Sequence, residues 1–203
     1  EYHVVPVGAS TFAESLRMGT GISQSLKKIL LENDLQTEVG DEGGFAPHIN
    51  SSDEAFTFLV RAIEEAGYVP GSDAWLGIDA AASEFFDGER QLYNLDGEPL
   101  AEADLAARYR TWRERYPLIS IEDPFDQDAR EEWKRFTEKN DKLLQVVGDD
   151  LYVTNPKRIQ EGIVEGLTNS VLIKPNQIGT LSETLQAIKI SQAAGQNPVI
   201  SHR

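Results

Sequence analysis

Four ionisable residues each follow directly on an apolar run that reads as a buried strand. They are Asp79, Glu122, Asp149 and Lys174. Three clustered carboxylates repel one another unless they are protonated or surround a divalent cation, and oxygen ligands favour Mg²⁺ or Mn²⁺ over zinc. A lysine that is buried beside cations loses its preference for the ammonium form and can act as a general base. The set therefore indicates proton abstraction assisted by a metal ion.

Each of these residues also has a purely structural interpretation. A carboxylate at a strand end can cap the next helix or pair with a lysine, and Lys174 can pack its stem while its ammonium reaches water. The equivalent position of all four residues in successive units favours a shared site. Within Asp149-Asp150 the alternation of the preceding strand does not decide which carboxylate is the ligand.

The elements that would position these residues alternate between strands and helices. We expect strands over residues 75–80, 118–121, 143–147, 171–173 and 198–201, and helices over 101–116, 126–140, 155–165 and 180–194. Two further helices are predicted upstream, over 10–33 and 51–67. Alternation of this kind predicts an α/β fold with a parallel sheet, in which the strand ends share one edge.

The repeat length indicates which α/β fold is present. Asp79 to His202 spans 123 residues in four steps, about 31 residues per unit, and eight such units need roughly 250 residues. The chain has 203 residues, so we predict most of a TIM-type β/α barrel that lacks at least one closing unit. A doubly wound open sheet is the alternative, and the absence of a glycine-rich loop after the first strand disfavours it.

Composition excludes several classes of partner. The chain has 34 acidic and 19 basic residues and a net charge of −15, so nucleic acid and anionic membranes are not expected partners. No run of about 18 apolar residues is present, so we expect no membrane span. The sequence contains no cysteine, which fits a cytoplasmic protein.

The charges expected at the shared edge bear on the substrate. Five carboxylates against two basic groups leave three net negative charges, counting Glu1, Glu42, Asp79, Glu122, Asp149, Lys174 and Arg203. An anionic substrate could bind there only with cations present, and two Mg²⁺ ions would reverse the sign of the net charge. Arg203 offers a planar fork suited to phosphate or carboxylate.

Five segments of the chain form long and specific motifs. They are Gly40-Asp41-Glu42-Gly43-Gly44-Phe45-Ala46-Pro47, Ser120-Ile121-Glu122-Asp123-Pro124-Phe125, Gly148-Asp149-Asp150-Leu151, Leu172-Ile173-Lys174-Pro175-Asn176-Gln177 and Ser201-His202-Arg203. Together these segments resemble the enolase family, the glycolytic phosphopyruvate hydratases. Their order and spacing match over the whole chain. The resemblance implies a lyase that reversibly dehydrates 2-phospho-D-glycerate to phosphoenolpyruvate.

The resemblance also implies a role for each site residue. Lys174 resembles the base at C2, Glu42 resembles the acid that helps the C3 hydroxide leave, and Glu1 works beside it as a catalytic and substrate-side group. Asp79, Glu122 and Asp149 resemble the ligands of a tightly bound Mg²⁺, with a second Mg²⁺ arriving with the substrate. The remaining substrate contacts implied are Arg203 on the phosphate and His202 beside it, together with Glu122, Asp149 and Lys174.

Other implications concern what lies around this chain. Residues 1–203 are expected to be a partial barrel, with an N-terminal α+β domain and the last part of the barrel outside it. The family is cytoplasmic and usually homodimeric, and we expect the full-length protein rather than this piece alone to be active. Residues 83–99 resemble a mobile active-site loop, with a small hairpin at Asp96-Gly97. The alternatives are another dehydratase or racemase of the superfamily, or a non-catalytic enolase-like scaffold.

Overall fold

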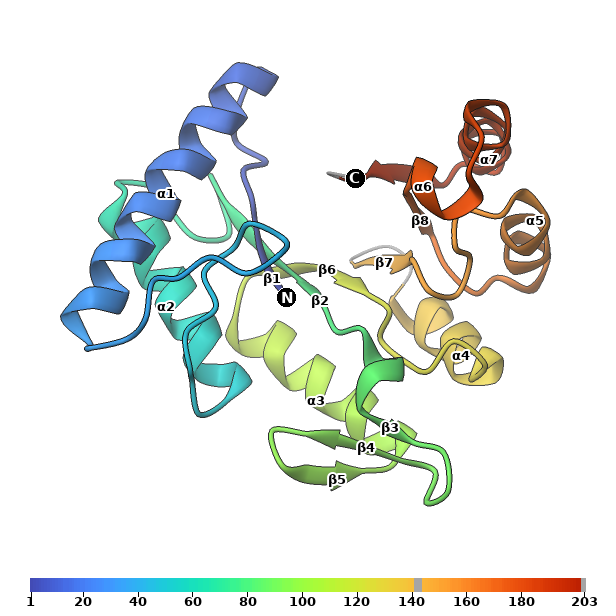
Figure 1. The fold of residues 1–203 in the computed structure, drawn as a ribbon, viewed down its shortest axis with the longest axis horizontal. Helices are drawn as coiled ribbons and strands as arrows, with labels where there is room; N and C mark the ends of the chain where they lie inside the picture. Colours follow the sequence, from blue (N-terminus) through green and yellow to red (C-terminus); the bar gives the residue numbers. More distant parts are fainter. Residues whose placement is uncertain (141–143, 202–203) are drawn as a thin grey trace. The chain divides into compact units, whose positions relative to one another are not determined.

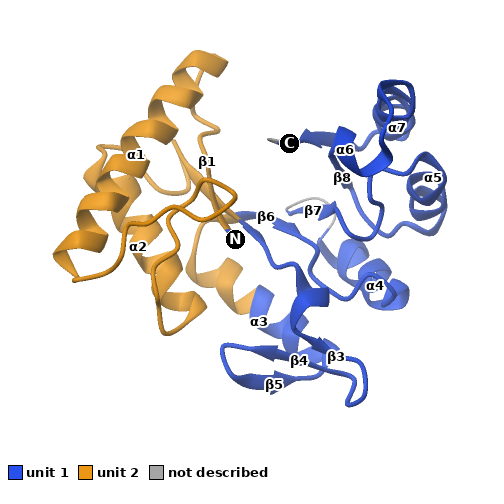
Figure 2. Cartoon of the chain, viewed as in Figure 1, with its two compact units in different colours: residues 1, 78–109, 119–203 blue, residues 2–77, 110–118 orange. Residues whose placement is uncertain are grey.

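The computed structural model describes residues 1–140 and 144–201, and these form two compact units. One unit holds residues 1, 78–109 and 119–203, and the other holds residues 2–77 and 110–118 (Figure 2). His202 and Arg203, and the start of the strand predicted over 143–147, lie outside the described residues. No helix in the described part of the chain is long and apolar enough to cross a bilayer.

Parallel strands form the first unit. Strands β6 (Leu118–Glu122), β7 (Gln145–Gly148), β8 (Ser170–Ile173) and β9 (Asn197–Ile200) pair in that order, all parallel (Figure 1). Helices α4 (Arg130–Asn140), α5 (Pro156–Glu165) and α7 (Leu181–Ala193) alternate with them, as predicted. A short helix, α6 (Pro175–Ile178), follows β8 directly and was not predicted. The alternation confirms the predicted α/β class.

The second unit carries the upstream helices. Strand β1 (Tyr2–Val5), helices α1 (Phe12–Glu32) and α2 (Ser52–Glu65), and the start of β2 (Trp75–Asp79) belong to it, with the end of α3 (Glu102–Arg115). Helices α1 and α2 pack against each other. The strand order of the sheet is β1-β2-β6-β7-β8-β9. Strands β2 and β6 each contribute residues to both units.

Local sequence explains most helix starts. Ser51, Asn155 and Thr180 each accept a backbone hydrogen bond from the first turn of the helix that follows them. Helix α4 begins at Arg130 rather than 126, because the Asp126 carboxylate accepts the N–H of Asp128 at 3.0 Å and closes a turn first.

The segment predicted as a long loop over residues 83–99 is largely a small antiparallel sheet. Its strands are β3 (Phe86–Asp87), β4 (Leu92–Leu95) and β5 (Glu98–Leu100), preceded by the 3₁₀ turn Ala82–Phe85. The predicted hairpin at Asp96-Gly97 is confirmed, since both residues have the positive φ that a two-residue hairpin turn needs. Buried Tyr93 anchors the sheet, because its hydroxyl accepts the N–H of Asp126 at 2.9 Å and its ring packs against Phe125.

Asp53 joins α2 to α3 within the second unit, and its removal should destabilise the protein. Its carboxylate accepts the hydroxyl of Tyr116 at 2.9 Å and the indole N–H of Trp112 at 3.3 Å, and lies 2.5 Å from the Arg115 guanidinium. Asp53→Ala should lower the free energy of unfolding of the full-length protein by about 1–3 kcal/mol, because it removes the carboxylate that accepts from two part-buried donors. Urea denaturation measures the loss.

Asp104→Ala is the matched control for Asp53→Ala. Asp104 also lies in the first turn of a helix but is exposed, so its removal tests the charge at a helix N-terminus alone. Equal losses for the two variants would contradict the role given to the indole and phenol donors.

Candidate active site at the carboxyl ends of the strands

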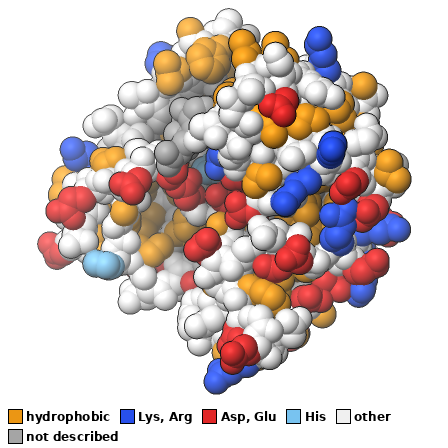
Figure 3. All heavy atoms as spheres, turned by 45° about the vertical axis from the view of Figure 1, so that its right-hand side comes forward, with side chains coloured by type: hydrophobic (Ala, Val, Ile, Leu, Met, Phe, Trp, Pro, Cys, Tyr) orange, Lys and Arg blue, Asp and Glu red, His pale blue; other side chains and the backbone are white. Residues whose placement is uncertain are grey.

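The structure places all four predicted strand-end residues in the first unit. Asp79 and Glu122 are the last residues of β2 and β6, while Asp149 and Lys174 directly follow β7 and β8. The Ala80 N–H donates to the backbone oxygen of Glu122 at 2.9 Å, which holds the ends of β2 and β6 together. Acidic side chains are spread over the visible face of the molecule, in keeping with its negative charge (Figure 3).

Lys174 and Asp149 form an ion pair across the ends of β7 and β8. The Lys174 Nζ atom lies 2.5 Å from Asp149 Oδ2, and the Asp149 side chain is only 7% exposed. Burial lowers the pKa of Lys174, as expected from the sequence. The hydrogen bond that Lys174 donates to Asp149 and the charges of Asp149, Glu122 and Asp79 raise the pKa by more, so the net shift is upward. Without a cation at the site, Lys174 is therefore an ammonium ion.

Buried Glu122 has three acidic neighbours whose charges act on it, Asp79, Asp123 and Asp149. Burial, and then the charges of Asp79, Asp123 and Asp149, raise the pKa of Glu122 to about 9. A hydrogen bond to the ionised form would oppose this rise, but no described residue donates one to its carboxylate. A donor set of buried, crowded oxygens fits a hard divalent cation, whose charge would offset the repulsion.

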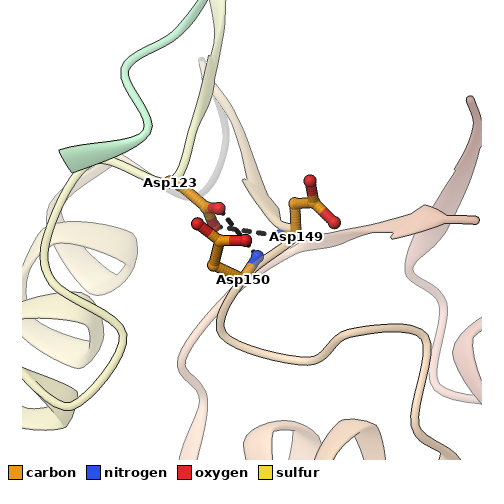
Figure 4. Close-up of side chains that lie close together, drawn as sticks. All are labelled: Asp123, Asp149 and Asp150. Atoms are coloured by element: carbon orange, nitrogen blue, oxygen red, sulfur yellow. Dashed lines mark hydrogen bonds between the residues drawn. The ribbon is translucent and has the colours of Figure 1, made fainter. Parts of the chain in front are cut away.

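Asp123, Asp149 and Asp150, rather than the predicted set of Asp79, Glu122 and Asp149, form the cluster with metal-ligand spacing among the described residues. One oxygen of each lies within 4.8 Å of the others, close enough to hold a metal ion. However, Asp123 Oδ1 accepts the N–H of Asp149 at 2.9 Å, and Asp123 Oδ2 accepts the N–H of Asp150 at 2.7 Å (Figure 4). Because both its oxygens already hold backbone donors, Asp123 is better suited to brace the turn after β7 than to bind a cation.

The two carboxylates of Asp149-Asp150 have different neighbours. The carboxylate of Asp149 projects away from that of Asp123, and it is the one that contacts Lys174 (Figure 4). Sequence reasoning did not assign this bracing role to Asp123. The position of Asp123 in the Glu122-Asp123-Pro124 run at the end of a strand was visible in the sequence. The sequence pattern could not predict that Asp123 accepts hydrogen bonds from residues 26 and 27 positions away.

Comparison of the chain with known proteins shows which family it belongs to. Residues 1–203 match the family described as enolase, C-terminal TIM barrel domain. The chain belongs to the enolase family. It is 47% identical over all 203 residues to the enolase of Anaplasma phagocytophilum (strain HZ), and it covers 47% of that protein. The chain thus spans about half the length of this enolase, and the match confirms the predicted TIM-type barrel class.

The other residues to which the enolase resemblance gave a role lie in different parts of the chain's structure. The backbone oxygen of Glu1 accepts the Asp79 N–H at 3.0 Å, so Glu1 lies beside the end of β2. Glu42 lies in the second unit, in a turn closed by the Gly43 N–H donating to Gly40. His202 and Arg203 are outside the described residues. The roles of these residues remain predictions.

One contact of Asp149, and a second contact that supports it, were not predicted from the sequence. Gln177 Nε2 donates to Asp149 Oδ1 at 2.8 Å, and Thr154 donates to Gln177 Oε1 at 2.9 Å. Gln177 belongs to the enolase-like segment that contains Lys174. Its contact with Asp149, at the end of β7, depends on the helical turn of α6, which the sequence analysis did not predict. Enolase membership and the acidic cluster together indicate a metal site at these strand ends.

Proposed function

We propose that the full-length protein reversibly dehydrates 2-phospho-D-glycerate to phosphoenolpyruvate and water. The observation that carries the proposal is the Lys174–Asp149 pair, 2.5 Å apart at adjacent strand ends of a chain that belongs to the enolase family. A lysine held against a carboxylate in a cluster of buried acids is a group whose proton affinity depends on the local charge.

Three residues would carry the proton transfers. Lys174 Nζ takes the proton from C2, and the electron pair of the broken C–H bond moves onto the substrate carboxylate. That pair then forms the C2–C3 double bond as the C3–O bond breaks, and Glu42 gives its proton to the departing hydroxide, which leaves as water. Glu1 assists beside Glu42. In the reverse direction Glu42 receives a proton from water and Lys174 returns its own.

Asp79, Glu122 and Asp149 would hold one Mg²⁺, and a second Mg²⁺ would join with the substrate. Bound there, the cations would stabilise the second negative charge that develops on the substrate carboxylate when the C2 proton leaves. Glu122 and Asp149 also lie among the charges that raise the pKa of Lys174, so ligands and base share one electrostatic environment. This coupling supports their assignment to one site.

The substrate phosphate would bind the guanidinium of Arg203, with His202 as a neighbour, because a planar fork pairs with phosphate oxygens in two parallel hydrogen bonds. We further propose that the full-length protein is a cytoplasmic homodimer. The net charge of −15 on these 203 residues agrees with a small anionic substrate entering only where cations offset the carboxylates.

Turnover of 2-phospho-D-glycerate by the full-length protein tests the proposal. The enol product absorbs in the ultraviolet, so its formation can be followed directly with and without Mg²⁺. We expect turnover that requires Mg²⁺. A folded protein that binds Mg²⁺ but leaves 2-phospho-D-glycerate unchanged would overturn the assignment, and sugar-acid dehydration would then be assayed.

A further inference from the structure

A chain of hydrogen bonds runs from the part-buried backbone N–H of Lys174, directly after β8, to the carboxylate of Asp149. The Lys174 N–H donates to Thr154 Oγ1 at 2.8 Å, Thr154 Oγ1 donates to Gln177 Oε1 at 2.9 Å, and Gln177 Nε2 donates to Asp149 Oδ1 at 2.8 Å. The chain connects the turn after β7 with the segment after β8. It ends on the side of Asp149 opposite its contact with Lys174.

The hydroxyl of Thr154 sets the orientation of the Gln177 amide. A hydroxyl has one proton, and Thr154 already accepts the Lys174 N–H, so that proton goes to Gln177 Oε1 at 2.9 Å rather than to the Leu172 carbonyl at 3.5 Å. The oxygen of the Gln177 amide therefore faces Thr154, and its NH₂ group faces Asp149. An inverted amide would present an oxygen to a carboxylate oxygen.

Thr154 is held in place for this contact. It is fully buried, and its φ of 56° lies in the left-handed region that a β-branched residue seldom adopts. The backbone conformation costs free energy, so surrounding interactions must maintain it. The hydroxyl bonds to Lys174 and Gln177 are interactions of that kind, because a hydroxyl pointed elsewhere would leave the part-buried N–H of Lys174 without its acceptor.

We propose that Gln177 and Thr154 are positioning residues for the metal site. A carboxylate turns easily about its terminal bond, and the Gln177 donor on Oδ1 holds Asp149 in one orientation while adding no positive charge that would repel a cation. Lys174 holds Oδ2, and Asp123 holds the backbone N–H. The inference rests on the proposed function, since it assigns to Asp149 the cation that the dehydration requires. Outer partners of this kind commonly change metal affinity by 10- to 100-fold.

Titration calorimetry with Mg²⁺ on the full-length protein tests the inference without reference to turnover. Gln177→Leu should weaken Mg²⁺ binding by about 10- to 100-fold, because Asp149 loses the donor that orients it. Thr154→Val should weaken it in the same direction, since the Gln177 amide is then free to invert. Thr154→Ser keeps the hydroxyl and should bind within about twofold of the unchanged protein, which a merely space-filling role for Thr154 would not produce.

Gln192→Leu is the matched control, because Gln192 is an exposed glutamine on α7 and should leave Mg²⁺ affinity unchanged. If Thr154→Val fails to fold, Gln177→Leu carries the test, since Gln177 is only partly buried. Unchanged Mg²⁺ affinity in folded Gln177→Leu overturns the inference while leaving the proposed function intact. An unsubstituted protein that binds no Mg²⁺ and leaves 2-phospho-D-glycerate unchanged overturns the proposed function instead.

Discussion

Replacing Lys174 with methionine should reduce turnover of 2-phospho-D-glycerate by the full-length protein by about 10²- to 10⁴-fold, the usual contribution of a positioned general base. Methionine keeps most of the apolar stem but has no nitrogen to take the C2 proton. The loss should fall on kcat, because the neutral amine of Lys174 acts on the reacting C–H bond rather than on the phosphate. Absorbance of the enol product at saturating Mg²⁺ measures the rate.

Two comparisons separate the loss of a base from a loss of structure. Lys189→Met, at an exposed position on α7, should retain full turnover. The Lys174→Met protein should also still bind Mg²⁺, because Asp79, Glu122 and Asp149 are unchanged and Asp149 has lost a competing cation at 2.5 Å. A Lys174→Met protein that turns over within a few-fold of the original would remove Lys174 from the mechanism.

Gly162→Ala should destabilise the first unit, although alanine is ordinarily the better helix former. A Cβ at position 162 would lie 2.2 Å from the hydroxyl oxygen of Tyr152 and 2.4 Å from Cε1 of its ring. The ring is 1% exposed, and its hydroxyl is hydrogen-bonded to Thr168 at 2.9 Å. Neither α5 nor the ring can withdraw without breaking packing, so we expect a loss of about 1–3 kcal/mol or more in the free energy of unfolding.

The sign of this effect is what makes Gly162→Ala informative. Gly21→Ala, in α1, introduces a Cβ with no heavy atom within 4 Å and should stabilise the protein by about 0.5–1 kcal/mol. Urea denaturation of the full-length protein in Mg²⁺ measures both variants. In the double variant Tyr152→Ala with Gly162→Ala, the two losses should be much less than additive, because the clash is already removed. A Gly162→Ala protein as stable as Gly21→Ala would show that the ring has room to move.

Apolar runs and helix caps were sufficient to predict the alternating strands and helices of the βα units. Four-residue runs such as 170–173 are buried throughout, and capping residues such as Ser51 and Thr180 do begin their helices. These features are local, because a strand or a cap is decided by residues within a turn or two of one another. The same local logic failed over 83–99, where polar composition predicted a loop but burial of Tyr93 stabilises a small sheet.

The sequence by itself determined which residues stand at the strand ends, since the period of the βα units and the end of each apolar run place Asp79, Glu122, Asp149 and Lys174. Only the tertiary structure decided how Asp149 is used. Its brace by Asp123 spans 26 positions and its amide partner Gln177 lies 28 positions away. Such contacts depend on where neighbouring strands end and how α6 turns, and distances of that kind are set by packing rather than by the order of residues.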